Sequence, residues 1–255
     1  MAGNNARAGV SVTSKVVALL GAFDGAHRVL TLSELARRAD VPVPTAFRLV
    51  GELVAGGLLE RRPSGEYAVG RRLWDLGLLA PVQSELRQPA SPFLNDLYGA
   101  TLATVHLAIR DGLEVLYLDR LSGNASVPVV SQVGSRLPLH ATGVGKVLLA
   151  HAPAEVVMCV LGNLTRITPY TITQPGRLRA ELRRVHKEGF AQTVEEMSLG
   201  ACSVAVPITS PSSSGRGSVV AALGIVVPSL KRNRPQLVAA LRVAAQGIGR
   251  SLSTE

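Results

Sequence analysis

Residues 31–57, TLSELARRADVPVPTAFRLVGELVAGG, decide the first part of the fold, because they carry the signals of two helices joined by a tight turn. Thr31 and Glu34 stand three residues apart, so each side chain can accept a hydrogen bond from the free backbone N–H of the other residue; this is a capping box. Pro42 cannot continue that helix, whereas Pro44 suits the first turn of the next one, which a Gly-Gly pair ends. The pattern predicts a short helix, a turn and a second helix.

The second helix should have one buried face and an exposed N-terminal turn. Its apolar stripe is predicted to consist of Phe47, Val50, Leu53 and Val54. The residues left near the exposed turn are Val43, Thr45, Ala46 and Arg48. In a helix-turn-helix the second helix enters the major groove with this end first. Thr45 can bond a phosphate or a base edge there, and Arg48 can reach guanine or the DNA backbone.

Flanking elements complete a winged helix-turn-helix. Helical spacing predicts a first helix over about residues 14–24, and residues 58–70, LLERRPSGEYAVG, predict two short strands around a Pro-Ser-Gly turn, where a basic wing lies against phosphates. The alternative is a three-helix structural domain with solvated arginines, but the ordered set of elements favours DNA binding. The candidate DNA contacts are Val43, Pro44, Thr45, Arg48, Arg61 and Arg62.

The composition bounds the class of protein. The chain has 255 residues, 47% of them hydrophobic, which suggests one large or two small domains with a packed core. Its 27 basic and 18 acidic residues give a net charge of +9, which indicates an anionic partner.

No apolar run reaches the roughly 18 residues of a membrane span, and the N-terminus lacks a secretory signal. Two lone thiols, Cys159 and Cys202, are expected to be buried. We expect a soluble cytoplasmic protein with no membrane partner.

The rest of the chain predicts a linker and a second domain. Residues 73–88 indicate an amphipathic linker helix, with breaks at Pro81, Pro89 and Pro92 and with Trp74 at a domain or dimer contact. Beyond it, helices are predicted at about 92–98, 143–151, 154–161, 176–188 and 234–251, strands at 126–132, 190–194, 203–209 and 218–227, a hairpin over 101–121 that turns at Asp111–Gly112, and a flexible turn at 210–217. The predicted divisions are a flexible tail at 1–12, a DNA-binding domain at 13–72, the linker at 73–88 and an effector-binding and oligomerisation domain at 89–255. Such mixed elements around an antiparallel sheet make an α+β domain.

Residues 137–150, LPLHATGVGKVLLA, raise the question of a nucleotide site. A phosphate loop needs Gly, four residues and then Gly-Lys-Ser/Thr; here His140 stands where the first glycine belongs, and Val147 follows Lys146. No catalytic pattern is evident either: the five histidines lack paired-ligand spacing, and Glu195–Glu196 have no evident partners for a metal. We expect no catalytic residue, metal or cofactor. The loop keeps free backbone N–H groups at a helix start, which attract anions.

Residues 16–79 resemble the IclR family of bacterial transcriptional regulators. The resemblance is carried by LTLSELARRADVPVPTAFRLVGELVAGGLLERRPSGEYAVGRRLWDLG, residues 30–77, above all by Thr45, Ala46, Arg48 and Leu49. The later elements follow the order of that family's effector-binding domain, a mainly antiparallel α/β fold similar to GAF and PAS sensors. Family members often carry Lys-Ser where this chain has Val43–Pro44, and Gly where it has Asp40, so a positive charge and a capping hydroxyl are missing from the DNA-facing turn.

The resemblance also implies an effector pocket. In the family, the loop matching HATGVGK supplies backbone amides to the effector, and later strands complete the pocket. Carried over by motif, the candidate effector-binding residues are Gly143, Val144, Thr193, Ser203, Gly224 and Val226. Gly224 and Val226 lack the acidic or hydroxyl groups found where very small oxo-acids bind, so we expect a roomier, more apolar pocket for a larger or partly hydrophobic carboxylate, such as an aromatic one. In the alternative, Thr193 and Ser203 are ordinary strand residues and the loop only caps a helix.

These expectations define an effector-responsive DNA-binding regulator. One recognition helix reads only a few base pairs, so two copies on a pseudo-palindrome are expected, as a homodimer or a dimer of dimers. The partners are then double-stranded operator DNA and a small-molecule effector. Two alternatives stay open: an enzyme acting on a small carboxylate with an accessory DNA-binding domain, and a ligand-independent architectural DNA binder.

Overall fold

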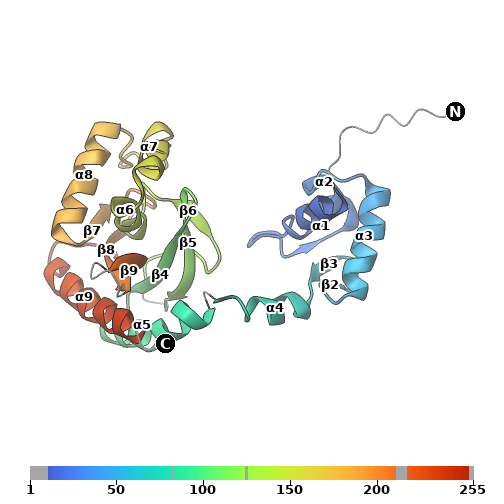
Figure 1. Ribbon diagram of the computed structural model, residues 1–255, viewed down its shortest axis with the longest axis horizontal. Helices are drawn as coiled ribbons and strands as arrows, with labels where there is room; N and C mark the ends of the chain where they lie inside the picture. Colours follow the sequence, from blue (N-terminus) through green and yellow to red (C-terminus); the bar gives the residue numbers. More distant parts are fainter. Residues whose placement is uncertain (1–10, 82, 124–125, 211–216, 253–255) are drawn as a thin grey trace. The chain divides into compact units, whose positions relative to one another are not determined.

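The computed structural model describes residues 11–81, 83–123, 126–210 and 217–252, and it divides into two compact units on either side of the Ala80–Pro81 bond (Figure 1). Most of the predicted tail, residues 1–10, lies outside the described residues, and Val12 already begins a helix. The predicted linker, residues 73–88, runs across the boundary between the units. In the described part of the chain, no helix is both long and apolar enough to cross a membrane.

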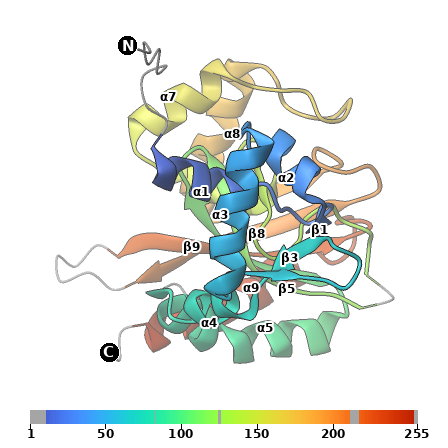
Figure 2. The same ribbon diagram turned by 90° about the vertical axis from the view of Figure 1, so that its right-hand side faces the viewer.

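The first unit combines a three-helix domain with a small sheet and a fourth helix at its end. Its elements are α1 (Val12–Leu20), β1 (Val29–Leu30), α2 (Leu32–Arg38), α3 (Val43–Ala55), β2 (Leu59–Arg61), β3 (Tyr67–Val69) and α4 (Arg71–Gly77). The strands pair antiparallel in the order β1-β3-β2. In Figure 2, α3 faces the viewer. The predicted helix-turn-helix and the two strands of the wing are confirmed.

The start of α2 is built as the sequence indicates. The backbone N–H of Thr31 donates to Oε2 of Glu34 at 2.8 Å, and the N–H of Glu34 donates to Oγ1 of Thr31 at 3.3 Å, so the capping box is confirmed. After α2, Asp40 adopts a left-handed conformation with φ of +51°. Glycine reaches this region without strain, which explains why Gly is the expected residue here. Pro42 is the N-cap of α3, which therefore has no side-chain cap.

The buried face of α3 differs from the predicted stripe. The side chains in the core are Ala46, Leu49, Val50 and Leu53, at the spacing i, i+3, i+4 and i+7. The prediction is wrong for Phe47, which is 64% exposed, and for Ala46, which is fully buried. A stripe that begins at Ala46 places Phe47 about 100° further around the helix, toward solvent.

The second unit is built on one six-stranded antiparallel sheet in the order β6-β5-β4-β9-β8-β7. After a π-helical turn (Gln83–Arg87), its elements are α5 (Gln88–Thr101), β4 (Thr104–Asp111), β5 (Glu114–Leu121), β6 (Arg136–Pro138), α6 (Gly143–Ala150), α7 (Ala154–Gly162), α8 (Pro175–Glu188), β7 (Ala191–Val194), β8 (Cys202–Ser210), β9 (Ser218–Val227) and α9 (Arg234–Ser251). Helices α5 and α9 lie on one face of the sheet, and α6 to α8 lie on the other (Figure 1). The predicted α+β class is confirmed.

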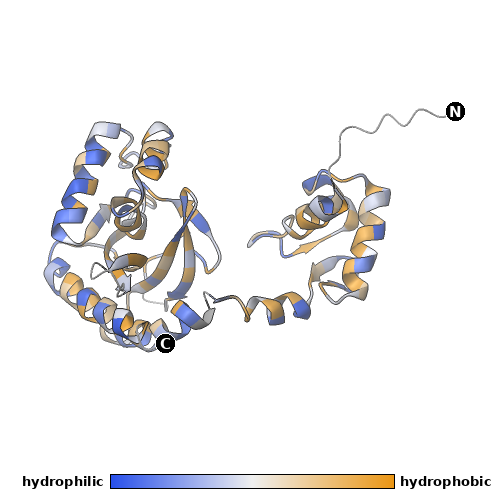
Figure 3. Cartoon of the chain, viewed as in Figure 1, coloured by the Kyte–Doolittle hydropathy of each residue, from blue (hydrophilic) through white to orange (hydrophobic). Residues whose placement is uncertain are grey.

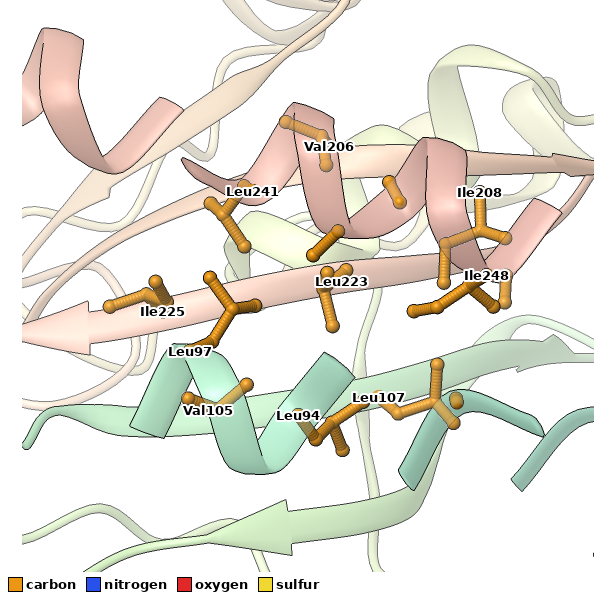
Figure 4. Packing of buried hydrophobic residues seen from close by; sticks show 14 of the residues in the cluster. Leu94, Leu97, Val105, Leu107, Val206, Ile208, Leu223, Ile225, Leu241 and Ile248 are labelled. Atoms are coloured by element: carbon orange, nitrogen blue, oxygen red, sulfur yellow. The ribbon is translucent and has the colours of Figure 1, made fainter. Parts of the chain in front are cut away.

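Alternation along the strands sends side chains into two separate cores. On the α5–α9 face, Val105 and Leu107 of β4 pack with Leu223 of β9 and with both helices, as Figure 4 shows. On the opposite face, Ala205 and Ala222 are small and leave room for α6. Figure 3 shows the consequence in hydropathy: the strands are mostly hydrophobic, whereas α8 is mostly hydrophilic because only a few of its side chains point inward.

Several predictions for the second unit are wrong. Pro89 lies in the first turn of α5, where no N–H is needed, and the helix continues through Pro92, so neither proline breaks it. Residues 126–132 form no strand, since Pro128 lacks the N–H of a ladder residue, and β6 is the edge strand instead. Cys159 is exposed on α7. The predicted turn at 210–217 lies almost wholly outside the described residues. The remaining predicted helices and strands are confirmed within a few residues.

Candidate functional site

A cavity lies between the start of α6 and the face of the sheet that α6 covers. With the part open to solvent it encloses about 490 Å³. All six residues that the sequence indicates for an effector line this cavity: Gly143, Val144, Thr193, Ser203, Gly224 and Val226. They come from α6, β7, β8 and β9, so the fold brings together residues up to 83 positions apart.

The strand register explains why these side chains meet. Thr193 of β7 pairs with Ser203 of β8, and Ser203 pairs with Val226 of β9, so the three stand in one row across the sheet. Directly paired residues of antiparallel strands project to the same face. Gly224 lies two residues before Val226 on β9 and therefore belongs to the same face, one row away.

The N-terminus of α6 forms one polar end of the cavity. Thr142 is its N-cap, and Oγ1 of Thr142 accepts a hydrogen bond from the N–H of Gly145 at 3.1 Å. The N–H of Lys146 makes the next bond, to the carbonyl of Thr142 at 2.9 Å. The N–H groups of Gly143 and Val144 come before this bond, at positions that have no intrahelical acceptor. Within the part of the chain that the structure describes, neither N–H donates a hydrogen bond, as the sequence leads us to expect.

Two hydroxyls and a close backbone approach complete this end. Oγ1 of Thr193 and Oγ of Ser203 are 2.6 Å apart and hydrogen-bonded. A Cβ on Gly143 would come within 2.5 Å of Oγ of Ser203, so a larger residue there would displace this hydroxyl. A Cβ on Gly224 would likewise come within 2.8 Å of Cγ1 of Val144.

The cavity has a second polar feature, centred on His106, that sequence reasoning missed. Nε2 of His106 and Oγ of Ser131 are hydrogen-bonded at 2.8 Å, and the imidazole meets the ring of Tyr117 edge-on, with 4.9 Å between centroids. Burial, helped by the charge of Arg120, lowers the pKa of His106 to about 3, so the ring is neutral near pH 7. The alternation of side chains along β4 is the sequence signal that could have found His106. Its side chain points to the other face of the sheet from that of Val105, away from the α5–α9 core.

Loops supply the remaining wall, and their course could not be deduced from residue patterns. Residues 129–131 line the cavity on one side, and Met197, Ser198 and Ala201 line it on another. These segments add mostly apolar surface. Burial also raises the pKa of Tyr117, so its phenol keeps its proton.

Lys146 does not line the cavity. Its side chain is fully buried, and Nζ lies 2.6 Å from Oε1 of Glu196 and 4.0 Å from Oε1 of Glu181. Burial raises the pKa of Glu196, and the charge of Lys146 opposes that shift. Glu196 therefore neutralises a buried cation rather than joining a metal site. The described residues hold no cluster of three or more His, Cys, Asp or Glu side chains suited to a metal.

The six candidate DNA contacts lie on the start of α3 and on the wing. Val43, Pro44 and Arg48 are exposed, and Thr45 is half-buried. Arg48 pairs with Glu52 one turn later, at 2.7 Å. On the wing, Arg61 and Arg62 are exposed, and the guanidinium of Arg61 lies over the ring of Tyr67. The exposed Phe47 joins the same helix surface, an addition to the residues that the sequence indicates.

Comparisons with known proteins bear on both units. The family model for the IclR helix-turn-helix domain matches residues 12–63, and the model for the bacterial transcriptional regulator IclR C-terminal domain matches residues 80–250. An IclR homologue of Microbacterium hydrocarbonoxydans, solved in complex with 4-hydroxybenzoate, is 37% identical, with 95% of this chain and 99% of that chain covered and a TM-score of 0.89. Thermotoga maritima IclR is 29% identical, with 94% and 96% covered and a TM-score of 0.73.

Curated relatives agree with the structural ones. The regulator XynR of Escherichia coli strain K12 is 29% identical, with 85% of each chain covered. The repressor AllR of the same strain is 28% identical, with 91% of this chain and 86% of its own covered. These relatives are transcriptional regulators and not enzymes. Since family models match both the helix-turn-helix and the larger sheet-centred unit, this chain belongs to the IclR family of bacterial transcriptional regulators.

Proposed function

We propose that this regulator binds operator DNA through α3 and the wing, and that a single-ring aromatic carboxylate in the cavity changes its affinity for DNA. The observation that carries the ligand class is the polar end of the cavity, where the free N–H groups of Gly143 and Val144 stand beside the Ser203 hydroxyl. Such amides and the helix dipole favour an anion. The ligand of the Microbacterium relative, 4-hydroxybenzoate, belongs to this class.

On the DNA side, the exposed start of α3 is suited to the major groove. Thr45 and Arg48 supply donors for bases and phosphates, and Phe47 offers an apolar surface for a thymine methyl group. Arg61 and Arg62 on the wing are suited to phosphate oxygens. The surface pair of Arg48 with Glu52 is worth at most about 1 kcal/mol, so exchanging it for a DNA contact costs little.

Pairing of two chains is part of the proposal. Exposed apolar side chains gather on and just after α4: Trp74, Leu76, Leu78 and Leu79. A second copy that covers these side chains would produce a homodimer, and two dimers a dimer of dimers, with one recognition helix for each half-site of a pseudo-palindrome. The ligand changes DNA affinity only to the extent that it binds the DNA-competent and DNA-incompetent states unequally.

The ligand part is tested by calorimetry of the full-length protein with benzoate, 4-hydroxybenzoate and glyoxylate. We expect the aromatic acids to bind more tightly than glyoxylate and to raise the midpoint of thermal unfolding. Selection of binding sequences from random duplex DNA then supplies an operator. Its affinity is measured by fluorescence anisotropy with and without the ligand. Absence of binding by both aromatic acids, or an unchanged DNA affinity in their presence, would refute the ligand part.

The DNA part is tested with Arg48→Ala and Phe47→Ala. Arg48→Ala should abolish specific binding while leaving ligand affinity unchanged, because the two sites share no residue. Phe47→Ala should weaken binding by about 1 kcal/mol or more and relax the preference at one base pair. Arg183→Ala, which removes an exposed arginine of α8 in the other unit, is the matched control and should bind operator normally. Normal binding by Arg48→Ala would show that α3 is not the recognition helix.

A further inference from the structure

The cavity has two polar ends with an apolar stretch between them. One end holds the α6 amides with Ser203 and Thr193, and the other holds His106 with Ser131. Along the sheet, Gly224 and Val226 of β9 lie between the two ends, and neither has a side-chain polar atom; Tyr117, Thr142 and Ser198 also line the cavity. A ligand that lies along the cavity therefore meets a polar group at each end and an apolar wall in the middle.

The register sets the separation of the two ends. His106 of β4 pairs with Gly224 of β9, which pairs with Ala205 of β8, and Ser203 lies two residues before Ala205. With the usual strand spacing and rise per residue, the Cα atoms of His106 and Ser203 are about 12 Å apart along the sheet. One benzene ring with polar substituents at opposite positions, hydrogen-bonded at both ends, spans a distance of this kind.

The chemistry of the two ends differs. The α6 end offers several donors and a helix N-terminus, which suits a carboxylate. At the other end, Nε2 of His106 is bound to Ser131, and within the described residues Nδ1 has no hydrogen-bond partner. Because the ring is neutral, one of its nitrogens carries a proton and the other accepts a hydrogen bond. The Ser131 hydroxyl can donate to Nε2 or accept from it, so it is compatible with both tautomers. Nδ1 can therefore pair with a neutral hydroxyl as donor or as acceptor.

We propose that His106 selects ligands with a hydroxyl group at the end opposite the carboxylate, so that para-hydroxylated single-ring aromatic acids are the preferred class. This rests on the proposed carboxylate ligand of the same cavity. Ser131 and the edge of Tyr117 hold the imidazole in place. A ligand without the hydroxyl leaves the Nδ1 group of His106 desolvated and unpaired, which is the usual source of strong discrimination by a polar site.

The test compares four acids on the full-length wild-type protein by calorimetry: 4-hydroxybenzoate, 3-hydroxybenzoate, benzoate and 4-methylbenzoate. The methyl compound fills the same space without a hydrogen bond. We expect 4-hydroxybenzoate to bind roughly 10- to 100-fold more tightly than 4-methylbenzoate, with the 3-hydroxy isomer close to benzoate. Equal affinities for the 4-hydroxy and 4-methyl compounds would overturn the inference and leave the proposed carboxylate ligand standing. If none of the four binds, the proposed ligand class itself fails.

Variants then assign the preference to His106. In His106→Phe the 4-hydroxy preference should fall to within about threefold while benzoate still binds, and in His106→Gln part of the preference should return. The control is His151→Phe, because His151 caps the other end of α6, away from the cavity. It should keep the full preference. Circular dichroism and thermal unfolding show whether each variant is folded, and the wild-type comparison decides even if His106→Phe is not. A full preference in folded His106→Phe would overturn the assignment.

Discussion

The ammonium group of Lys146 lies 2.6 Å from Oε1 of Glu196, and both side chains are buried. The pair ties α6 to the segment just before Met197, which lines the cavity. The backbone carbonyl of Glu196 is held as well, since it accepts a hydrogen bond from Oγ1 of Thr171 at 2.7 Å. The ion pair thus fixes two parts of the cavity wall relative to each other.

Removal of the cation alone should be costly. Lys146→Met leaves the Glu196 carboxylate buried without its cationic partner, and we expect it to lower the free energy of unfolding by about 3–5 kcal/mol. The double variant Lys146→Met, Glu196→Leu removes both charges and should recover much of that loss. Urea denaturation of the three proteins measures the difference. If Lys146→Met alone were as stable as the wild type, the ion pair would contribute nothing to the free energy of unfolding.

Two glycines of α6 should respond differently to alanine. A Cβ on Gly145 would clash with the backbone carbonyl of Leu139, whereas the one close clash of a Cβ on Gly143 is with the side-chain oxygen of Ser203. Gly145→Ala should therefore destabilise the fold by about 1–3 kcal/mol. Gly143→Ala should keep near-normal stability, because the Ser203 hydroxyl can turn away.

That rotation has a consequence for ligand binding. Turning Oγ of Ser203 breaks its hydrogen bond with Thr193 and disturbs the proposed carboxylate end. Gly143→Ala should weaken binding of an aromatic acid about tenfold or more. Thermal unfolding and calorimetry on the same samples separate the two effects. Equal losses of stability in both variants would contradict this account.

Stability should depend on pH through His106. Its pKa is lowered from 6.5 to about 3, first by burial and then by the charge of Arg120. Below pH 6.5 the unfolded chain takes up a proton that the folded protein refuses until about pH 3. The stabilisation of the fold by the neutral ring of His106 is therefore complete above pH 6.5. As the pH falls, the free energy of unfolding decreases progressively, by at most roughly 1.4 kcal/mol per pH unit.

Comparison with His106→Phe isolates this contribution from other titrating groups. Above pH 7 the difference in free energy of unfolding between the two proteins should be constant. From pH 6.5 down to pH 4 this difference should shift in favour of the variant, because phenylalanine has no group that takes up a proton. Chemical denaturation at half-unit pH steps provides the profiles, and parallel profiles over this range would rule out a buried neutral His106.

The turn before α3 offers a gain in stability. Asp40 adopts φ of +51°, a region that costs side-chain-bearing residues energy. Asp40→Gly should raise the free energy of unfolding by about 0.5–1 kcal/mol, the relief of strain being partly offset by the greater entropy of the unfolded chain. The matched variant Asp40→Asn removes the same charge and keeps a side chain, and we expect little change in its stability.

The same two variants separate the effect of backbone strain on DNA affinity from the effect of charge. Both remove a negative charge beside the proposed recognition helix, so both should bind DNA more tightly at low salt. Anisotropy titrations at two salt concentrations measure this. If only Asp40→Gly gains affinity, the charge of Asp40 is not what limits binding.

Local signals in the sequence were sufficient for most elements. The capping box of α2, the glycines after α3 and the Asp111–Gly112 hairpin all act through hydrogen bonds between residues a few positions apart, so their outcome depends on little else. Residues 126–132 show the limit of such signals. Their valines are typical of a strand, but strand formation needs a neighbour, and β6 pairs with β5 instead.

The sequence by itself determined the winged helix-turn-helix, the α+β class and, through family resemblance, six residues that turn out to line one cavity. Only the tertiary structure decided which residues face each other across long separations. His106 meets Ser131 across 25 positions, and Lys146 meets Glu196 across 50. Even on α3, the exposure of Phe47 depended on which helix face the neighbouring helices cover. Such contacts follow from strand register, loop course and helix packing, which depend on the whole domain rather than on neighbouring residues.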